Sequence, residues 1–147
     1  SGTFTIAMAR MVGEAGRVIA VDVQEEMLQM VRQKAVKEGL TCRIITHQSE
    51  PDRIGISDRV DFALAFYMIH EVPDVDAFLM EVASLLKPSG KLLIAEPLMH
   101  VSESSFKKTV DAARLAGLKP VSEPKIRFSR SMLFQPDNAI DSRNDLV

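Results

Sequence analysis

Apolar residues follow two patterns that alternate along this chain. Continuous apolar runs, which are typical of buried strands, occupy residues 17–22, 41–46, 60–66 and 91–96. Apolar residues three and four apart, which are typical of amphipathic helices, occupy residues 3–12, 25–38, 74–86 and 104–116. Because parallel strands need helical crossovers, this alternation predicts an α/β fold with a mainly parallel sheet.

Residues that begin or end helices fall at the expected boundaries. Gly13 and Gly39 follow apolar helical segments and predict their C-terminal ends, whereas Asp74 predicts an N-cap. Pro88-Ser89-Gly90 predicts a turn before the strand at 91–96.

Two extended segments, 118–126 and 130–134, follow Gly117. Their connection is too short for a crossover helix, so we expect them to be antiparallel. No linker or internal repeat divides the chain, and its 147 residues predict one domain over residues 1–147.

Composition narrows the function classes. The net charge of -2 gives no large positive field, which disfavours a nucleic acid or an anionic membrane as partner and favours a small molecule. No apolar stretch approaches the roughly 20 residues that span a bilayer.

The single cysteine, Cys42, lies in an apolar run and predicts a reduced core thiol and a cytoplasmic protein. The start at Ser1, without an initiating Met, leads us to expect that the chain lacks its beginning.

Three features together predict a nucleoside pocket. The first is a glycine, Gly2, that leads into a helix; the second is a strand ending in Asp22; the third is a later strand introduced by 85–90. Glycine allows a ligand close to the backbone, a helix N-terminus favours an anionic group, and a carboxylate can accept both ribose hydroxyls. Asp22 can also cap the following helix.

With these motifs the chain resembles the class I S-adenosylmethionine-dependent methyltransferases, over nearly its whole length. The resemblance implies a Rossmann-like, doubly wound, three-layer α/β/α fold with a C-terminal antiparallel strand pair. It also implies S-adenosylmethionine as cofactor, S-adenosylhomocysteine as product and a small-molecule methyl acceptor. The cofactor-binding residues that it implies are Gly2, Thr3, Asp22, Val23, Met27, Gln48, Ser49 and Phe66.

This sequence departs from the family pattern in two places. The family's first strand and first loop glycines have no counterpart here, so we expect an N-terminally incomplete domain whose exposed sheet edges favour a homo-oligomer. Where the family often has an acidic residue near the adenine, this chain has His47-Gln48-Ser49, and Gln48 can hydrogen-bond an adenine edge.

The resemblance implies in-line methyl transfer, in which the protein chiefly positions the reactants. Phe66 and Tyr67, at the end of the strand 60–66, are candidates for contact with the sulfonium, and Tyr67 and His70 are the candidate catalytic residues. His70 and Glu71 can equally be a packed edge residue and a helix-terminal charge. The three histidines lack paired ligand spacing, so we expect no metal. Met27 and Met30 have positions typical of core packing.

Two other functions share part of this pattern. A non-catalytic partner subunit fits a methyltransferase fold with an incomplete cofactor loop. A nicotinamide-dependent dehydrogenase shares the glycine turn and the acid after the second strand, although the antiparallel ending argues against it.

Overall fold

A computed structural model describes residues 2–138 of the protein, and Ser1 of the expected glycine loop lies outside them. Contacts divide the chain into two compact units, with the boundary between Ile56 and Ser57. We call the residues up to Ile56 unit 1 and those from Ser57 unit 2, and we describe each by itself.

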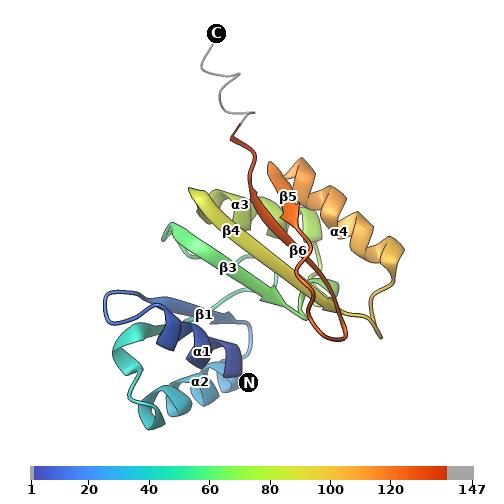
Figure 1. The fold of residues 1–147 in the computed structure, drawn as a ribbon. Coiled ribbons are helices and arrows are strands. Elements are labelled where there is room, and N and C mark those ends of the chain that lie inside the picture. Colours follow the sequence, from blue (N-terminus) through green and yellow to red (C-terminus); the bar gives the residue numbers. More distant parts are fainter. Residues whose placement is uncertain (1, 139–147) are drawn as a thin grey trace. The chain divides into compact units, whose positions relative to one another are not determined.

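Unit 1 is a two-stranded parallel sheet with two helices. Its elements are α1 (Thr3–Met11), β1 (Val18–Asp22), α2 (Glu25–Lys37) and β2 (Ile44–Gln48) (Figure 1). The register pairs Val18 with Ile44 and Asp22 with Gln48, so both strands end at the same edge. Both helices pack on β1 and on each other, which places them on one face of the sheet.

Small and branched side chains form the core of unit 1. The buried residues are Ile6, Ala9, Val18, Ala35 and Leu40. Gly39 ends α2 with a φ of 69°, and the backbone N–H of Leu40 then donates to the Ala35 carbonyl at 2.8 Å. This αL ending turns Leu40 back into the core, as the glycine predicted. An ion pair of Arg10 with Glu38 joins α1 to the end of α2.

Unit 2 is a mixed four-stranded sheet in the order β3-β4-β6-β5. β3 (Val60–Phe66) and β4 (Leu86–Pro97) are paired in parallel, and the helix α3 (Val75–Leu85) connects them along the chain. After α4 (Glu103–Leu115), β5 (Leu118–Ser122) and β6 (Ser129–Pro136) form an antiparallel pair, and β6 returns antiparallel along β4 (Figure 1). These strand directions confirm the predicted α/β class and the reversed C-terminal pair.

The core of unit 2 lies between its sheet and the helices α3 and α4, which contact each other. Its largest fully buried apolar side chains are Ile69, Leu79, Leu86, Leu92, Ile94, Leu118 and Phe134. Asp74 caps α3, because its Oδ1 accepts the N–H of Ala77 at 3.0 Å, as predicted. Ser102 caps α4 in the same way through the N–H of Ser105.

Several sequence-based boundaries were wrong. The extended segment expected at 118–126 ends at Ser122. The strand expected at 41–46 begins only at Ile44, because Thr41–Arg43 forms a 3₁₀ turn. The turn expected at 88–90 is part of β4, where the ladder to β3 shifts between Val60 and Phe62 and leaves residues 87–90 outside it. The helix expected over 3–12 ends at Met11.

Burial corrects three further expectations. Cys42 is exposed, because the 3₁₀ turn replaces the strand that was expected to bury it. Met30 is 42% exposed on α2 and is not a core residue. In α1, expected to be well buried, only Ile6 and Ala9 are buried. Among residues 2–138, no helix has the length and apolar character needed to cross a membrane.

Candidate functional site

Asp22 ends β1 with only one of its carboxylate oxygens engaged. Its Oδ1 accepts the backbone N–H of Gln24 at 2.9 Å, a local bond of the kind that Asp makes in turns. Within the described residues Oδ2 has no hydrogen-bond partner, and the side chain is half-buried. Asp22 therefore shapes the entry into α2 while one oxygen is left to accept hydroxyl groups of a ligand.

The end of β2 lies directly beside Asp22. The N–H of Ser49 donates to the Asp22 carbonyl at 3.0 Å, and Nε2 of Gln48 donates to the Val23 carbonyl at 3.1 Å. These two bonds bring Asp22, Val23, Gln48 and Ser49 to the same edge of the sheet. Ligands of parallel α/β sheets bind at this edge, beyond the carboxyl ends of the strands.

The start of α1 lies at the same end of unit 1. Because the chain turns between α1 and β1 and the two elements pack together, the first residues of α1 lie toward the last residue of β1 (Figure 1). Gly2 is the N-cap of α1 with a φ of 77°, and an added Cβ would come 3.2 Å from Cγ2 of Val31. The positive φ strongly favours glycine here, and a Cβ would also be in tight contact with the Val31 side chain. Thr3 is exposed, and Met27 is half-buried in the first turn of α2.

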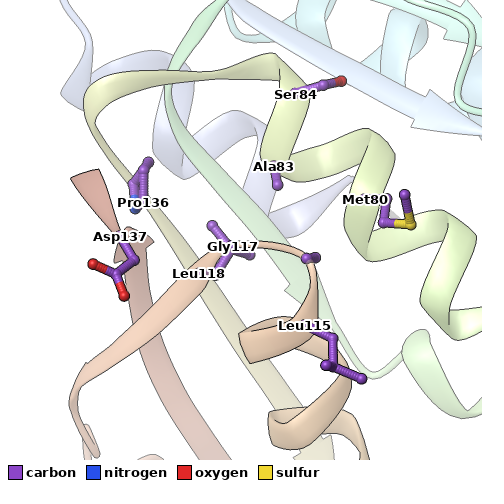
Figure 2. Close-up of a pocket in the computed structure, with 9 residues that line it drawn as sticks. Met80, Ala83, Ser84, Leu115, Gly117, Leu118, Pro136 and Asp137 are labelled. Atoms are coloured by element: carbon purple, nitrogen blue, oxygen red, sulfur yellow. The ribbon is translucent and has the colours of Figure 1, made fainter. Parts of the chain in front are cut away.

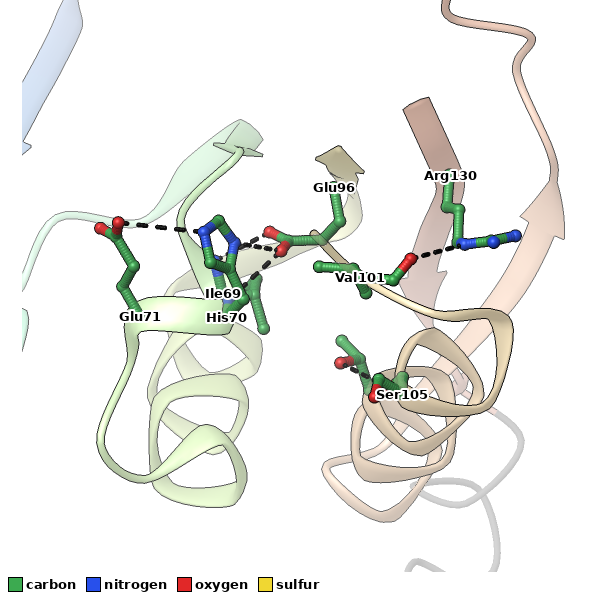
Figure 3. A network of polar contacts seen from close by, with 8 residues as sticks. Ile69, His70, Glu71, Glu96, Val101, Ser105 and Arg130 are labelled. Atoms are coloured by element: carbon green, nitrogen blue, oxygen red, sulfur yellow. Dashed lines mark hydrogen bonds and ion pairs between the residues drawn. The ribbon is translucent and has the colours of Figure 1, made fainter. Parts of the chain in front are cut away.

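In unit 2, His70 is bound by a buried carboxylate. Its Nδ1 lies 2.6 Å from Oε2 of Glu96, a side chain that is only 1% exposed at the end of β4 (Figure 3). Glu96 also accepts the backbone N–H groups of Ile69 at 2.9 Å and of His70 at 3.3 Å. On the other side of the ring, Nε2 of His70 lies 3.8 Å from Oε1 of the exposed Glu71.

Phe66 ends β3 and Tyr67 follows it, with their rings stacked and the centroids 4.0 Å apart. Tyr67 has a φ of 57°, a conformation that costs of order 1–3 kcal/mol for a residue with a side chain. Its N–H donates to the Ala95 carbonyl at 2.8 Å, and its hydroxyl lies 2.6 Å from Oγ of Ser129. Backbone and hydroxyl contacts together hold Tyr67 in this strained position.

A hollow of about 240 Å³ opens beside His70 in unit 2. Three valines give it apolar walls, and His100, Ser105 and Thr109 add polar groups; the valines are Val72, Val75 and Val101. The rings of His70 and His100 lie 6.5 Å apart between centroids, with 15° between their planes. The volume lies below the roughly 300–1,000 Å³ of most ligand pockets, so this hollow suits one ring or a short chain.

A second, larger depression of about 350 Å³ lies elsewhere in unit 2. Met80, Ala83 and Ser84 line it from α3, and Leu115, Gly117 and Leu118 line it from the junction of α4 and β5 (Figure 2). Its lining includes one carboxylate, Asp137, and neither a histidine nor a cysteine. The chemistry-bearing side chains are gathered instead at the smaller hollow.

The structure thus collects the residues singled out from the sequence into two groups. Unit 1 carries Gly2, Thr3, Asp22, Val23, Met27, Gln48 and Ser49. Unit 2 carries Phe66, Tyr67 and His70. In residues 2–138, no group of three or more His, Cys, Asp or Glu side chains is placed to hold a metal ion.

Sequence reasoning assigned no role to Glu96, the last residue of the apolar run 91–96. A signal for it was present: Glu96 ends the apolar run of β4, and His70 follows the end of the neighbouring parallel strand β3. Because parallel neighbours end at the same edge, a buried carboxylate there could have been assigned to the histidine.

Comparison with known proteins gives a family for the first three fifths of the chain. Residues 1–90 match the model of a family described as "Methyltransferase domain". A demethylmenaquinone methyltransferase of Lactobacillus johnsonii is 32% identical over 125 residues, which cover 80% of this chain and 51% of that protein. The ubiquinone/menaquinone biosynthesis C-methyltransferase UbiE of Escherichia coli is 31% identical over 97 residues, 65% of this chain and 39% of that protein. The chain therefore spans about half or less of the length of these relatives.

A solved structure is similar to this chain over nearly its whole length. It is a SAM-dependent methyltransferase from Aquifex aeolicus, which is 26% identical and superposes with a TM-score of 0.81. The alignment covers 92% of this chain and 77% of that one. This likeness confirms the Rossmann-like fold class that was predicted from the sequence.

Proposed function

This chain belongs to the methyltransferase domain family, and from that premise we propose that it transfers the methyl group of S-adenosylmethionine to a small-molecule acceptor. The observation that carries the proposal is the edge of unit 1 where Asp22 ends β1 beside the start of α1 at Gly2. The family match runs across the boundary between the units, which supports treating residues 1–147 as a single methyltransferase domain.

The residues at this edge have the chemistry that the cofactor requires. The free Oδ2 of Asp22 would accept ribose hydroxyls, and the first N–H groups of α1, after Gly2, favour the carboxylate of the amino-acid end. Gln48, whose Nε2 is bonded to Val23, has Oε1 to accept the adenine amino group beside Ser49. Met27 and the exposed Val23 supply apolar surface there. Bound S-adenosylmethionine supplies an electrophilic methyl carbon on a sulfonium, and S-adenosylhomocysteine is the product.

The acceptor side of the proposal rests on unit 2. His70 would accept at Nε2 the proton that the acceptor loses, which would leave the acceptor an electron pair for the incoming methyl group. A positioned base of this kind contributes roughly 10²–10⁴-fold to a rate. Phe66 and Tyr67 present stacked aromatic rings, and the face of such a ring attracts a cation, a sulfonium included, by about 0.5–2 kcal/mol.

We propose a ring of the quinol class as the acceptor. The support is that the two relatives are named for menaquinone or ubiquinone methylation, and that the small hollow beside His70 combines valine walls with hydroxyl and imidazole groups. A quinol has an acidic hydroxyl proton for a base and an electron-rich ring carbon for the methyl group; that carbon's own hydrogen then moves as a proton to the quinol oxygen, which restores the aromatic ring. The antiparallel β6 favours this function over a nicotinamide-dependent dehydrogenase.

The test is methyl transfer by the full chain, followed by mass spectrometry. The protein is incubated with S-adenosylmethionine carrying a deuterated methyl group and with a panel of reduced quinones. We expect a labelled methylated product, and a rate at least 100-fold lower in His70→Gln. Lys37→Gln, at an exposed residue in the last turn of α2, is the control and keeps the rate. Cofactor binding without any product, in a folded protein, would instead identify a non-catalytic subunit.

A further inference from the structure

Glu96 is the one buried carboxylate among the described residues, and all its hydrogen-bond donors belong to two consecutive residues. It is 1% exposed, and burying such a group is costly unless each oxygen is satisfied. Oε1 accepts the N–H of Ile69, and Oε2 accepts both the N–H and the Nδ1 of His70 (Figure 3). We propose that Glu96 is a positioning residue that holds the proton of neutral His70 on Nδ1, so that Nε2 is the proton acceptor.

The direction of each hydrogen bond leads to this assignment. An ionised carboxylate can only accept hydrogen bonds, so at 2.6 Å from Oε2 the Nδ1 of His70 must be the donor. A neutral imidazole carries one proton, and which nitrogen holds it is decided by the partner of the other nitrogen. With the proton on Nδ1, Nε2 has a free lone pair.

The surroundings of Nε2 agree with that role. No hydrogen bond from residues 2–138 occupies Nε2, and the His70 side chain is 31% exposed. Oε1 of Glu71, at 3.8 Å, can form an ion pair once Nε2 has gained a proton. Glu71 is 77% exposed, so its effect is screened by solvent, whereas the Glu96 bond is shielded from water.

The backbone fixes the geometry of the pair. β3 and β4 are parallel neighbours with Phe66 opposite Ala95, so the residues after β3 pass beside Glu96. The two backbone N–H groups bound by Glu96 belong to the 3₁₀ turn Ile69–Glu71. One carboxylate therefore sets both the path of the turn and the orientation of the imidazole that the turn carries.

This inference rests on the proposed role of His70 as the base, but its test does not need catalysis. Long-range ¹H–¹⁵N correlation spectra distinguish a protonated ring nitrogen from an unprotonated one, at a pH where the ring is neutral. We expect the proton of His70 on Nδ1 in the full chain. In Glu96→Gln the new amide can donate to Nδ1, so we expect the ratio of the two tautomers to invert.

Two matched variants separate this role from a general change of charge or packing. Glu71→Gln removes the other carboxylate at the ring, and His100→Ala removes the neighbouring imidazole; both keep the Nδ1–H tautomer. A proton on Nε2 in the unchanged protein overturns the inference, even if Glu96→Gln fails to fold. So does an inverted tautomer in Glu71→Gln, or an unchanged one in folded Glu96→Gln.

Catalytic activity is measured separately from the tautomer, so that the proposed function and this inference are tested by different readouts. If the protein methylates an acceptor, we expect Glu96→Gln to lower kcat by roughly 10²–10⁴-fold, with little change in KM for S-adenosylmethionine. A protein with the expected tautomers but no methyl transfer contradicts the proposed function and leaves the pair intact. Methyl transfer with the wrong tautomer contradicts this inference and the role of His70 as a base at Nε2, but not methyl transfer itself.

Discussion

Nδ1 of His70 lies 2.6 Å from Oε2 of Glu96, although 26 residues separate the two along the chain. The contact joins the turn after β3 to the last residues of β4 and is sealed from water on the Glu96 side. A histidine with one nitrogen held by a buried carboxylate and the other accessible is suited to proton transfer. The same carboxylate also stabilises the fold.

Glu96→Ala should therefore destabilise unit 2 strongly. The change leaves the N–H groups of Ile69 and His70 without their acceptor, and each buried unsatisfied donor costs about 1–3 kcal/mol. We expect a loss of about 2–5 kcal/mol in the free energy of unfolding, measured by urea denaturation. Glu71→Ala, at an exposed neighbour, should leave the urea midpoint unchanged; equal losses in both variants would refute the structural role of Glu96.

Asp74→Ala should weaken the start of α3. The Oδ1 of Asp74 accepts the N–H of Ala77, and loss of such a cap costs about 0.5–2 kcal/mol. Asp76→Ala removes a carboxylate of the same helix turn that makes no capping bond, so a smaller loss is expected. Comparison of the two urea midpoints tests the cap, and equal midpoints would argue against it.

The hydroxyl of Tyr67 and Oγ of Ser129 should be energetically coupled. They are 2.6 Å apart, and a hydrogen bond of this kind contributes about 0.5–1.5 kcal/mol. Tyr67→Phe and Ser129→Ala should each lower stability, and the double variant should lose less than the sum of the two. Strict additivity in this double-mutant cycle would show that the hydroxyls do not interact in solution.

Two glycines of the turn after α1 should respond differently to alanine. Gly13 has a φ of 74° with no atom within 4 Å of an added Cβ, so Gly13→Ala should cost about 1–2 kcal/mol of backbone strain. At Gly16 an added Cβ would lie 2.6 Å from the carbonyl oxygen of Val12, so the backbone must move. Gly16→Ala should therefore lower the unfolding midpoint of unit 1 more than Gly13→Ala, and the reverse order would contradict the described turn.

The sequence predicted the boundaries of those helices and strands whose ends are set by residues adjacent in the chain. The apolar run 60–66 became β3 with the same bounds, and Gly39 and Asp74 ended and began helices as expected. The shift of β2 to Ile44 was not predictable in this way. Leu40 packs into the core of unit 1 and accepts the N–H of Arg43, so tertiary packing rather than β propensity decides where the strand begins.

The candidate site could be predicted only in part, because the sequence shows the residues at strand ends but not which of them the fold brings together. Asp22 at the end of the run 17–22 and His70 after the run 60–66 were visible as residue types in a pattern. The partner of His70 was not, because Glu96 reaches it only through the register of β3 on β4. The hydrogen bond between Gln48 and Val23 likewise requires β2 to lie beside β1.

Binding of S-adenosylhomocysteine to the full chain, measured by calorimetry, tests the central claim most directly. Asp22→Asn keeps an oxygen for the Gln24 N–H but removes the charge that would hold the ribose; hydrogen bonds to charged groups contribute about 1.5–3 kcal/mol. We predict saturable binding that Asp22→Asn weakens by roughly 10- to 100-fold. Asp61→Asn, the same change at an exposed carboxylate paired with Lys87, should not alter it. No binding, or equal affinities in Asp22→Asn and the unchanged protein, would contradict the account.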